Sequence, residues 1–242
     1  MADNVSIKNL IISKDRKNIY ETVRRETKEK YDRDYFEKGI ITGKSCYMYY
    51  SWMPEQTLRM VYYLITQLPI KTSDRVLDFG CAKGFVVKAL RILDIEAYGV
   101  DVSEYAISKV DNEVKEYCDL IDGFSFNFDL LFDWTISKDV FEHIPEDQLE
   151  IISPYLSTRT KKMFVVIPLA PENTRGCFLV PEYNRDTTHV TARDARWWKE
   201  FFSSNGWEVL SCDLSFKGCK ESWVTGYPKG NAFIRLKSKE LS

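Results

Sequence analysis

Apolar stretches of strand length alternate along most of the chain with segments that have a helical period. Apolar runs predict strands at 75–79, 97–101, 117–122, 132–137, 162–169, 207–216 and 231–237. Apolar residues at helical spacing predict helices at 51–68, 85–93, 146–156 and 195–205. Turn residues at 227–231 join the last two strands into a hairpin. This order is typical of a three-layer, doubly wound α/β fold with a mostly parallel seven-stranded sheet and an antiparallel last strand.

Two segments depart from this alternation. Residues 1–50 are polar and charged, and their aromatic residues gather around Gly39 and Gly43. We interpret 1–50 as a helical segment that closes over a pocket as a lid, with packing into the core as the alternative. Residues 51–242 then form the main domain, interrupted by an irregular stretch at about 170–190. Because long loops in compact domains are usually functional, we expect this insertion to line a substrate pocket.

The composition excludes several classes of protein. The formal net charge of −2 gives no global field that would attract nucleic acid or an anionic membrane. No apolar run approaches the ~20 residues of a membrane span, and the N-terminus lacks a signal-peptide pattern. The six cysteines include no Cys-x-x-Cys pair. This favours reduced thiols in a cytoplasmic protein.

A glycine turn follows the first predicted strand of the sheet. The pattern is Asp78-x-Gly80-x-x-x-Gly84, and a predicted helix begins at Phe85. A dinucleotide fingerprint needs Gly-x-Gly-x-x-Gly, but Ala occupies position 82. A phosphate-binding P-loop needs Gly-Lys followed by Ser or Thr, which is also absent here. An acidic residue at this position would repel pyrophosphate but suits a ligand with an ammonium and a sulfonium group.

The same stretch resembles motif I of the class I S-adenosylmethionine (SAM)-dependent methyltransferases, whose fold is Rossmann-like. The resemblance implies SAM as the cofactor. It also implies that Asp78, Gly80, Cys81 and Gly84 hold the methionine part of SAM. The alternative is a strand, turn and helix whose glycines serve packing alone.

A second acidic residue, Asp101, ends the next predicted strand. The step from Asp78 is 101 − 78 = 23 residues, close to the ~20 expected for a carboxylate that binds ribose hydroxyls. The family carries an acidic residue here for this purpose, and we count the adjacent Val102 as cofactor-binding too. The alternative is that Asp101 only caps the following turn.

The resemblance extends to two further segments. In the family a carboxylate at the third strand binds the adenine amino group; Asp119 matches best and Asp122 is the second candidate. Residues 132–145 resemble the family's "FD…EHI" segment, which closes the SAM pocket and faces the acceptor. Ser137 at the carboxyl end of that strand is a cofactor-binding candidate, and His143 is a pocket or catalytic candidate.

His189 and Asp186 are the other catalytic candidates. A neutral His is the commonest general base near pH 7. Residues 185–190 resemble the Asp-x-x-His stretch before the last helix of some sugar and small-molecule methyltransferases. The alternative for His189 is a loop residue bonded to the backbone. Loop carboxylates are plentiful, but no ligand spacing indicates a metal, and we expect none.

These features predict methyl transfer from SAM to an oxygen or nitrogen of a small-molecule acceptor. By resemblance the acceptor is a sugar or sugar nucleotide of a bacterial polysaccharide or natural-product pathway. The expected partners are this acceptor and, in a homodimer, a second copy of the chain. Three alternatives stay open. The chain could bind SAM without catalysis, methylate protein or RNA through its aromatic N-terminal segment, or reduce a substrate with NAD bound at Asp101.

Overall fold

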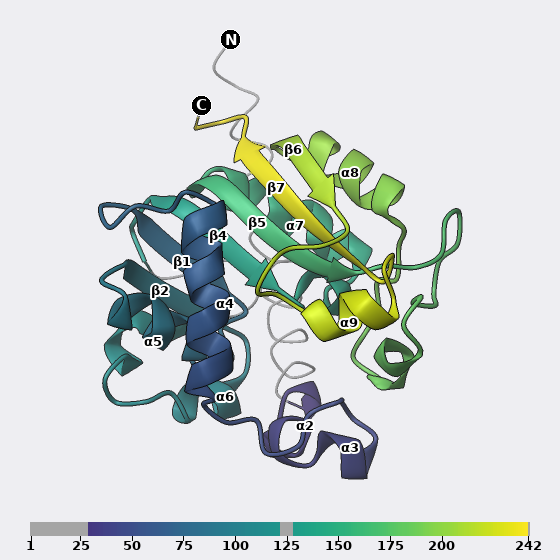
Figure 1. Ribbon diagram of the computed structural model, residues 1–242, viewed down its shortest axis with the longest axis horizontal. Helices are drawn as coiled ribbons and strands as arrows, with labels where there is room; N and C mark the ends of the chain where they lie inside the picture. The colour runs from purple at the N-terminus through teal and green to yellow at the C-terminus, as the bar shows by residue number, and fades with distance from the viewer. Residues whose placement is uncertain (1–28, 122–127, 242) are drawn as a thin grey trace, which may run out of the picture.

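One seven-stranded sheet organises the computed structural model, which describes residues 29–121 and 128–241 (Figure 1). The strands are β1 (Arg75–Phe79), β2 (Glu96–Asp101), β3 (Cys118–Leu120), β4 (Phe132–Lys138), β5 (Thr160–Pro168), β6 (Trp207–Asp213) and β7 (Asn231–Ser238). Their order is β3-β2-β1-β4-β5-β7-β6. The pairs among β1 to β5 are parallel, whereas β7 runs antiparallel to both β5 and β6. The predicted mostly parallel sheet is confirmed.

Helices connect these strands, and capping side chains fix where several of them begin. The α-helices are α2 (Arg33–Glu37), α3 (Gly39–Thr42), α4 (Pro54–Gln67), α5 (Phe85–Ile92), α6 (Glu104–Ser108), α7 (Glu146–Ser157), α8 (Ala195–Ser204) and α9 (Glu221–Gly226). Short 3₁₀ turns are η1 (Lys115–Tyr117), η2 (Phe141–His143) and η3 (Pro181–Arg185). The Ser103 hydroxyl accepts from the Ala106 N–H at the start of α6, and Asp194 caps α8 in the same way.

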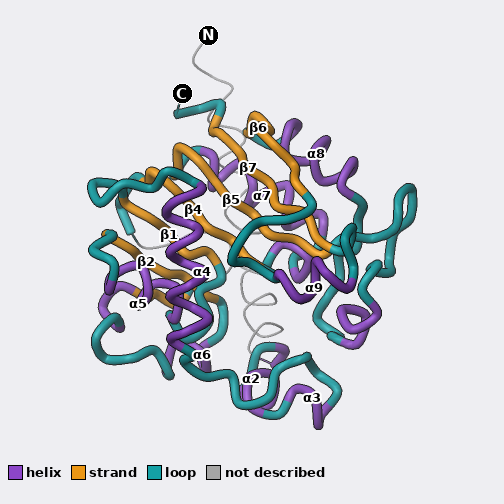
Figure 2. Tube along the Cα trace, in the orientation of Figure 1, coloured by secondary structure: helices purple, strands orange, loops and turns teal. Residues whose placement is uncertain are grey.

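The helices cover both faces of the sheet, as the tube view also shows (Figure 2). On one face, α4 and α5 bury apolar side chains such as Val61, Leu64 and Leu90 against β1 and β4. On the other face, α7 and α8 bury Leu149 and Trp198 in a second cluster. Two apolar layers of this kind hold the sheet between them. The protein is therefore a three-layer α/β structure.

The strand order reverses direction between β1 and β4. The chain moves outward from β1 through β2 to β3, then returns to place β4 on the other side of β1. In open α/β sheets, ligands bind at such a switch point, beyond the carboxyl ends of the strands. A ligand-binding site is therefore expected at the residues that follow β1, β2 and β4.

The connection between the last two strands differs from its prediction. β6 ends at Asp213, and α9 lies before the predicted turn at 227–231, in a stretch to which the sequence pattern assigned no element. The strand pattern extended to Phe216 because that side chain is buried, but it packs against Phe164 and Phe233 from a loop. Two expectations, concerning residues 1–28 and Asp122, lie outside the described residues.

Candidate active site

A cavity of about 1020 Å³ lies beyond the carboxyl ends of β1, β2 and β4. One end is formed by the turn after β1 and by the end of β2; we call this the cofactor half. The other end is bordered by residues 138–143, 183–189 and 218–223; we call this the acceptor half. The cavity is as large as the larger pockets that proteins use for small ligands.

The glycine turn of the cofactor half is held by backbone hydrogen bonds. The N–H groups of Gly80 and Cys81 both donate to the Val100 carbonyl, at 2.9 and 3.0 Å. Gly80 has a φ of +84°, and a Cβ there would lie 2.3 Å from Val140 Cγ2. The absent side chain therefore makes room for a neighbouring protein side chain, and a left-handed backbone is needed as well.

Two acids face this half of the cavity, the buried Asp78 and the half-buried Asp101. Asp101 accepts from the N–H groups of Ala82 at 2.7 Å and Ser103 at 2.8 Å. A carboxylate offers about four lone-pair positions, so two acceptor positions are left for a ligand. Burial, together with the charge of Asp101, raises the pKa of Asp78 to about 7. A buried carboxyl with a raised pKa suits a cationic ligand, because a nearby positive charge favours its ionised form.

The other predicted cofactor residues divide into two groups. Cys81 and Val102 line the cavity beside the two acids. Gly84 starts α5 with a φ of +73°, and its missing Cβ leaves room for Cys118 Sγ at 3.1 Å, away from the cavity. Asp119 and Ser137, on β3 and β4, are not among the residues that line the cavity.

Aromatic side chains from the N-terminal segment form one wall of the cavity. Tyr31, Tyr35, Tyr47 and Tyr50 all line it. This wall is tied to the glycine turn by a 2.6 Å ion pair between Lys83 and Glu37. Movement of this segment as a lid remains a prediction.

The acceptor half brings the three predicted catalytic residues together. Asp186, His143 and His189 all line it, and the two imidazole rings lie 4.5 Å apart. His189 Nε2 is 3.9 Å from Asp186 Oδ2 and 4.0 Å from Glu142 Oε1. Burial lowers the pKa of His189, against the opposing charge of Asp186. Burial and the neighbouring His189 lower the pKa of His143 to about 4. Both imidazoles are therefore neutral at pH 7.

Backbone bonding explains why these distant residues meet. The Glu142 carbonyl accepts from the N–H groups of Val190 and Thr191, each at 2.9 Å. This pair of bonds joins η2, which follows β4, to the end of the 170–190 insertion. Because His143 is adjacent to one partner and His189 to the other, the two rings are held close together across the junction, with their planes tilted by 57°.

A second charged cluster was not expected from the sequence. Asp139 contacts both Lys138, at 2.5 Å, and Lys220. Lys220 also donates to the Tyr183 hydroxyl at 2.9 Å. Although burial opposes it, these two ammonium groups hold the pKa of Asp139 well below its usual range. The position of Asp139 after β4 was a usable signal, whereas Lys220 lies between the predicted strand at 207–216 and the predicted turn at 227–231, where the pattern assigned no element.

The strand order, the glycine turn and the acid after β2 together define a class I SAM-dependent methyltransferase. Residues 51–212, more than half of the chain, match the family model described as "Methyltransferase domain". The chain belongs to this family, and its cofactor is SAM. No curated protein matches the chain. No described helix has the length and apolar character needed to cross a membrane.

Solved structures support the fold. A SAM-dependent methyltransferase from Clostridium acetobutylicum is 11% identical, with a TM-score of 0.56, over 77% of this chain and 92% of that one. Magnesium protoporphyrin IX methyltransferase from Synechocystis, solved with bound SAM, is 14% identical, with a TM-score of 0.55, over 91% and 97%. The [4+2]-cyclase SpnF is 15% identical, with a TM-score of 0.56, over 75% and 80%. At these identities the similarity shows the fold alone.

Proposed function

We propose that this enzyme transfers the methyl group of SAM to an oxygen or nitrogen of a small polar molecule, such as a sugar or sugar nucleotide. The observation that carries the proposal is the way the acceptor half is covered. The Tyr35 hydroxyl donates to Asp186 Oδ2 at 3.3 Å, and the Thr187 N–H donates to the Lys44 carbonyl at 3.3 Å. The N-terminal segment and the insertion are therefore bonded to each other beside the cavity, which favours a small acceptor over a folded macromolecule.

In this proposal the cofactor half binds the two ends of SAM with its two acids. Asp101 accepts hydrogen bonds from the ribose hydroxyls, and Asp78 faces the ammonium group of the methionine part. Gly80, Cys81 and Val102 line the space between them. SAM supplies a methyl group that is already electrophilic on its sulfonium. The main tasks of the protein are therefore to align the acceptor and to exclude water.

Charged and hydrogen-bonding groups in the acceptor half suit a polar acceptor. Lys138, Asp139 and Lys220 line one side of it, and Asp186 and His189 line another. These groups offer both donors and acceptors to hydroxyl groups. His189 Nδ1 lies 2.7 Å from the Tyr183 carbonyl, which accepts only, so Nδ1 carries the hydrogen and Nε2 has the lone pair. His189 Nε2 or Asp186 is then the group that takes the acceptor's proton.

Labelled methyl transfer tests the acceptor class directly. The purified enzyme would be incubated with methyl-labelled SAM and a cell extract, and the products would then be separated by size. We expect enzyme-dependent label in the small-molecule fraction, also when the extract has first been cleared of macromolecules. Label that appears only in protein or RNA would contradict the proposal. SAM binding without any transfer would favour a binding module.

Replacement of His189 tests the role assigned to the acceptor half. His189→Ala should lower turnover by about 10²–10⁴-fold, the usual contribution of a general acid or base. S-adenosylhomocysteine (SAH) affinity, measured by calorimetry, should stay unchanged because the cofactor half is intact. The exposed neighbour Arg185 provides the matched control, Arg185→Ala, with near wild-type turnover. Wild-type turnover in His189→Ala would remove this residue from the mechanism.

A further inference from the structure

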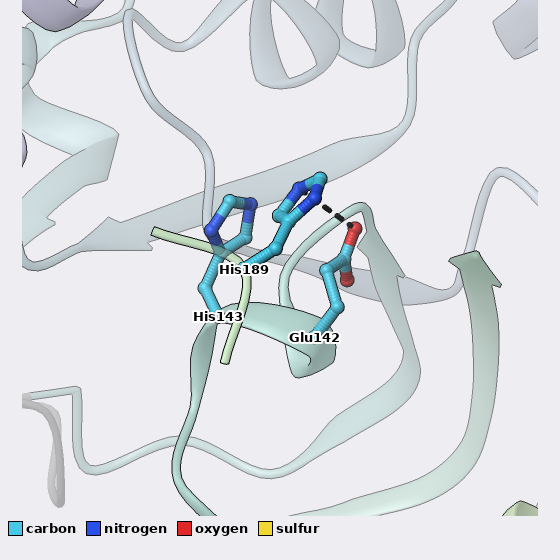
Figure 3. A group of neighbouring side chains, drawn as sticks. All are labelled: Glu142, His143 and His189. Atoms are coloured by element: carbon cyan, nitrogen blue, oxygen red, sulfur yellow. Dashed lines mark ion pairs between the residues drawn. The ribbon is translucent and has the colours of Figure 1, made fainter. Parts of the chain in front are cut away.

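Three side chains of the acceptor half, Glu142, His143 and His189, lie next to one another (Figure 3). Glu142, His143 and His189 each offer one ligand atom, and these atoms all lie within 4.8 Å of one another. Glu142 Oε1 is 4.0 Å from His189 Nε2, too far for a hydrogen bond. These two groups therefore lie close together without being bonded to each other.

The tautomers of both histidines follow from their partners. His189 Nδ1 donates to the Tyr183 carbonyl at 2.7 Å, so its Nε2 has a free lone pair. His143 Nδ1 lies 2.8 Å from Thr188 Oγ1, and that hydroxyl gives its own hydrogen to Asp186 Oδ1 at 2.6 Å. His143 Nδ1 must then donate to Thr188, which leaves the lone pair on His143 Nε2. Metal-binding histidines are typically fixed in this manner, with the other ring N–H bonded to a carbonyl or an acceptor side chain.

The Glu142 carboxyl has no hydrogen-bond partner in the described part of the chain. Its side chain is 0% exposed, and neither Oε1 nor Oε2 is bonded. A buried polar group without a partner destabilises the fold by roughly several kcal/mol, unless a bound ligand compensates. The backbone on either side is nonetheless fixed, because the Glu142 carbonyl accepts two N–H bonds at 2.9 Å. The group is held in place, and what it lacks is a positive partner.

We propose that Glu142, His143 and His189 bind one divalent transition-metal ion, through a Glu142 oxygen and the Nε2 atom of each histidine. Two imidazoles and one carboxylate suit Zn²⁺, Fe²⁺ or Co²⁺ better than Mg²⁺ or Ca²⁺, which prefer oxygen ligands. Ligand bonds of about 2.1 Å place neighbouring ligands roughly 3.0–3.5 Å apart. The 4.0 Å between Glu142 Oε1 and His189 Nε2 is longer than this range, and all the ligand atoms lie within 4.8 Å of one another, so binding requires the side chains to move closer around the ion.

This inference departs from the expectation that the chain binds no metal. That expectation rested on ligand spacing, but the third ligand lies 189 − 143 = 46 residues beyond the second. Tertiary hydrogen bonds bring them together, among them those from the end of the insertion to the Glu142 carbonyl. Local spacing in the sequence therefore contained no sign of the site.

The ion has a defined use if the proposed function holds. Three protein ligands leave positions open for an acceptor hydroxyl, whose pKa falls when its oxygen binds a metal ion. The released proton passes to Asp186, whose Oδ2 is 3.9 Å from His189 Nε2. In this arrangement His189 is a metal ligand, and Asp186 is the base. The use of the ion rests on the proposed function, but its binding does not.

Cobalt titration of the full-length protein, after treatment with a chelator, tests the site. We expect one Co²⁺ per chain, with visible absorption bands and a micromolar or lower dissociation constant. Glu142→Gln, His143→Gln and His189→Gln should each weaken binding at least tenfold. Thr188→Val, which removes the partner of His143 Nδ1 and also the hydrogen bond from this hydroxyl to Asp186, should weaken it severalfold. The control is Glu150→Gln, an exposed carboxylate on α7, with wild-type cobalt affinity. SAH binding checks that each variant is folded.

The possible outcomes separate the inference from the proposed function. The inference is overturned if wild-type protein binds no stoichiometric Co²⁺, or if the ligand variants bind it as well as wild type. A thiolate-to-cobalt charge-transfer band would assign the ion to cysteine and also overturn it. Methyl transfer by ion-free protein that binds no Co²⁺ keeps the function and removes the inference. Stoichiometric Co²⁺ binding without methyl transfer keeps the inference and removes the proposed function.

Discussion

The two halves of the cavity are built in different ways. The cofactor half comes from one continuous stretch, from β1 to the start of α6, and backbone hydrogen bonds shape its turn. The acceptor half comes from three separate segments around residues 138–143, 183–189 and 218–223, and the N-terminal wall lies against it. Ion pairs and side-chain hydrogen bonds join these segments. A local motif can specify the first half, whereas only the complete fold specifies the second.

The difference also extends to the charges. In the cofactor half, Asp78 and Asp101 are acids that face the cavity, and Asp78 has a raised pKa. In the acceptor half, Asp139 is neutralised by Lys138 and Lys220. The two acids of the first half therefore suit a cationic ligand. In the second half, Asp139 already has its positive partners within the protein, whereas the Glu142 carboxyl has no hydrogen-bond partner among the described residues.

The largest expected effect concerns the backbone of the cofactor half. Gly80→Val places a branched side chain at a φ of +84°, with its Cβ 2.3 Å from Val140 Cγ2. Strain and overpacking together should reduce the free energy of unfolding by about 2–6 kcal/mol. We expect the melting temperature, measured by calorimetry, to fall by about 10 °C. Gly80→Ala combined with Val140→Ala should recover part of the loss, and no recovery would mean that the clash is unimportant.

The second-largest expected effect concerns Asp101 and Asp119, the two acids predicted to bind the nucleoside part of SAM. Asp101→Ala removes a cavity-lining carboxylate that also fixes the Ala82 and Ser103 N–H groups. SAH binding should weaken by about 1–3 kcal/mol, the range for hydrogen bonds to a charged group. Asp119→Ala serves as the control, because Asp119 does not line the cavity. Equal losses in both variants, measured by calorimetry, would show that Asp119 also binds the cofactor.

A smaller effect should appear in the pH dependence of SAH binding. The pKa of Asp78 is raised to about 7 in the free protein, and the ammonium of SAH should lower it. SAH therefore binds the ionised form better, so affinity should fall as pH decreases through 7, by at most about tenfold per pH unit. Asp78→Asn should flatten this binding profile. A steep profile in the variant would assign the titration to another group.

The same substitution should affect stability. Because a raised carboxyl pKa lowers stability as pH rises above about 4, Asp78→Asn should also raise the melting temperature at pH 8.

The smallest effect concerns the link between the N-terminal wall and the cofactor half. Glu37→Gln weakens the 2.6 Å ion pair with Lys83 and the 2.8 Å hydrogen bond from the Tyr105 hydroxyl. If the segment acts as a lid, SAH should dissociate about 2- to 5-fold faster, as expected for the loss of a modest ion pair. Stopped-flow displacement would measure this rate, with Asp34→Asn on the same helix as the control. An unchanged rate would make the segment a fixed wall.

Five of the predicted cofactor residues line one cavity because the sequence information that positions them is local. Asp78, Gly80 and Asp101 lie within one strand, turn, helix and strand, and this spacing brings them to one edge of the sheet. The fold was predictable for the same reason, since each strand and helix has its own apolar period. His189 and Asp186 were recognisable as reactive residue types in a long loop.

Other features of the two halves could not be predicted from the local sequence pattern. Lys220 lies on a connection whose buried Phe216 imitates a strand residue. The burial of Glu142 depends on two hydrogen bonds from residues 190 and 191, at the far end of the insertion. Gly84 was expected to contact the ligand, but its missing Cβ instead makes room for Cys118. Each of these cases depends on a tertiary contact between segments distant in the sequence.

The most direct test of the central claim is a calorimetric titration with SAH, with NADH run in parallel. We propose that Asp78 and Asp101 form a site for the amino-acid and nucleoside ends of SAM, respectively. Such a site should bind SAH one-to-one with micromolar affinity and should not bind NADH. Binding of NADH, or failure of SAH to bind to the folded protein, would contradict it.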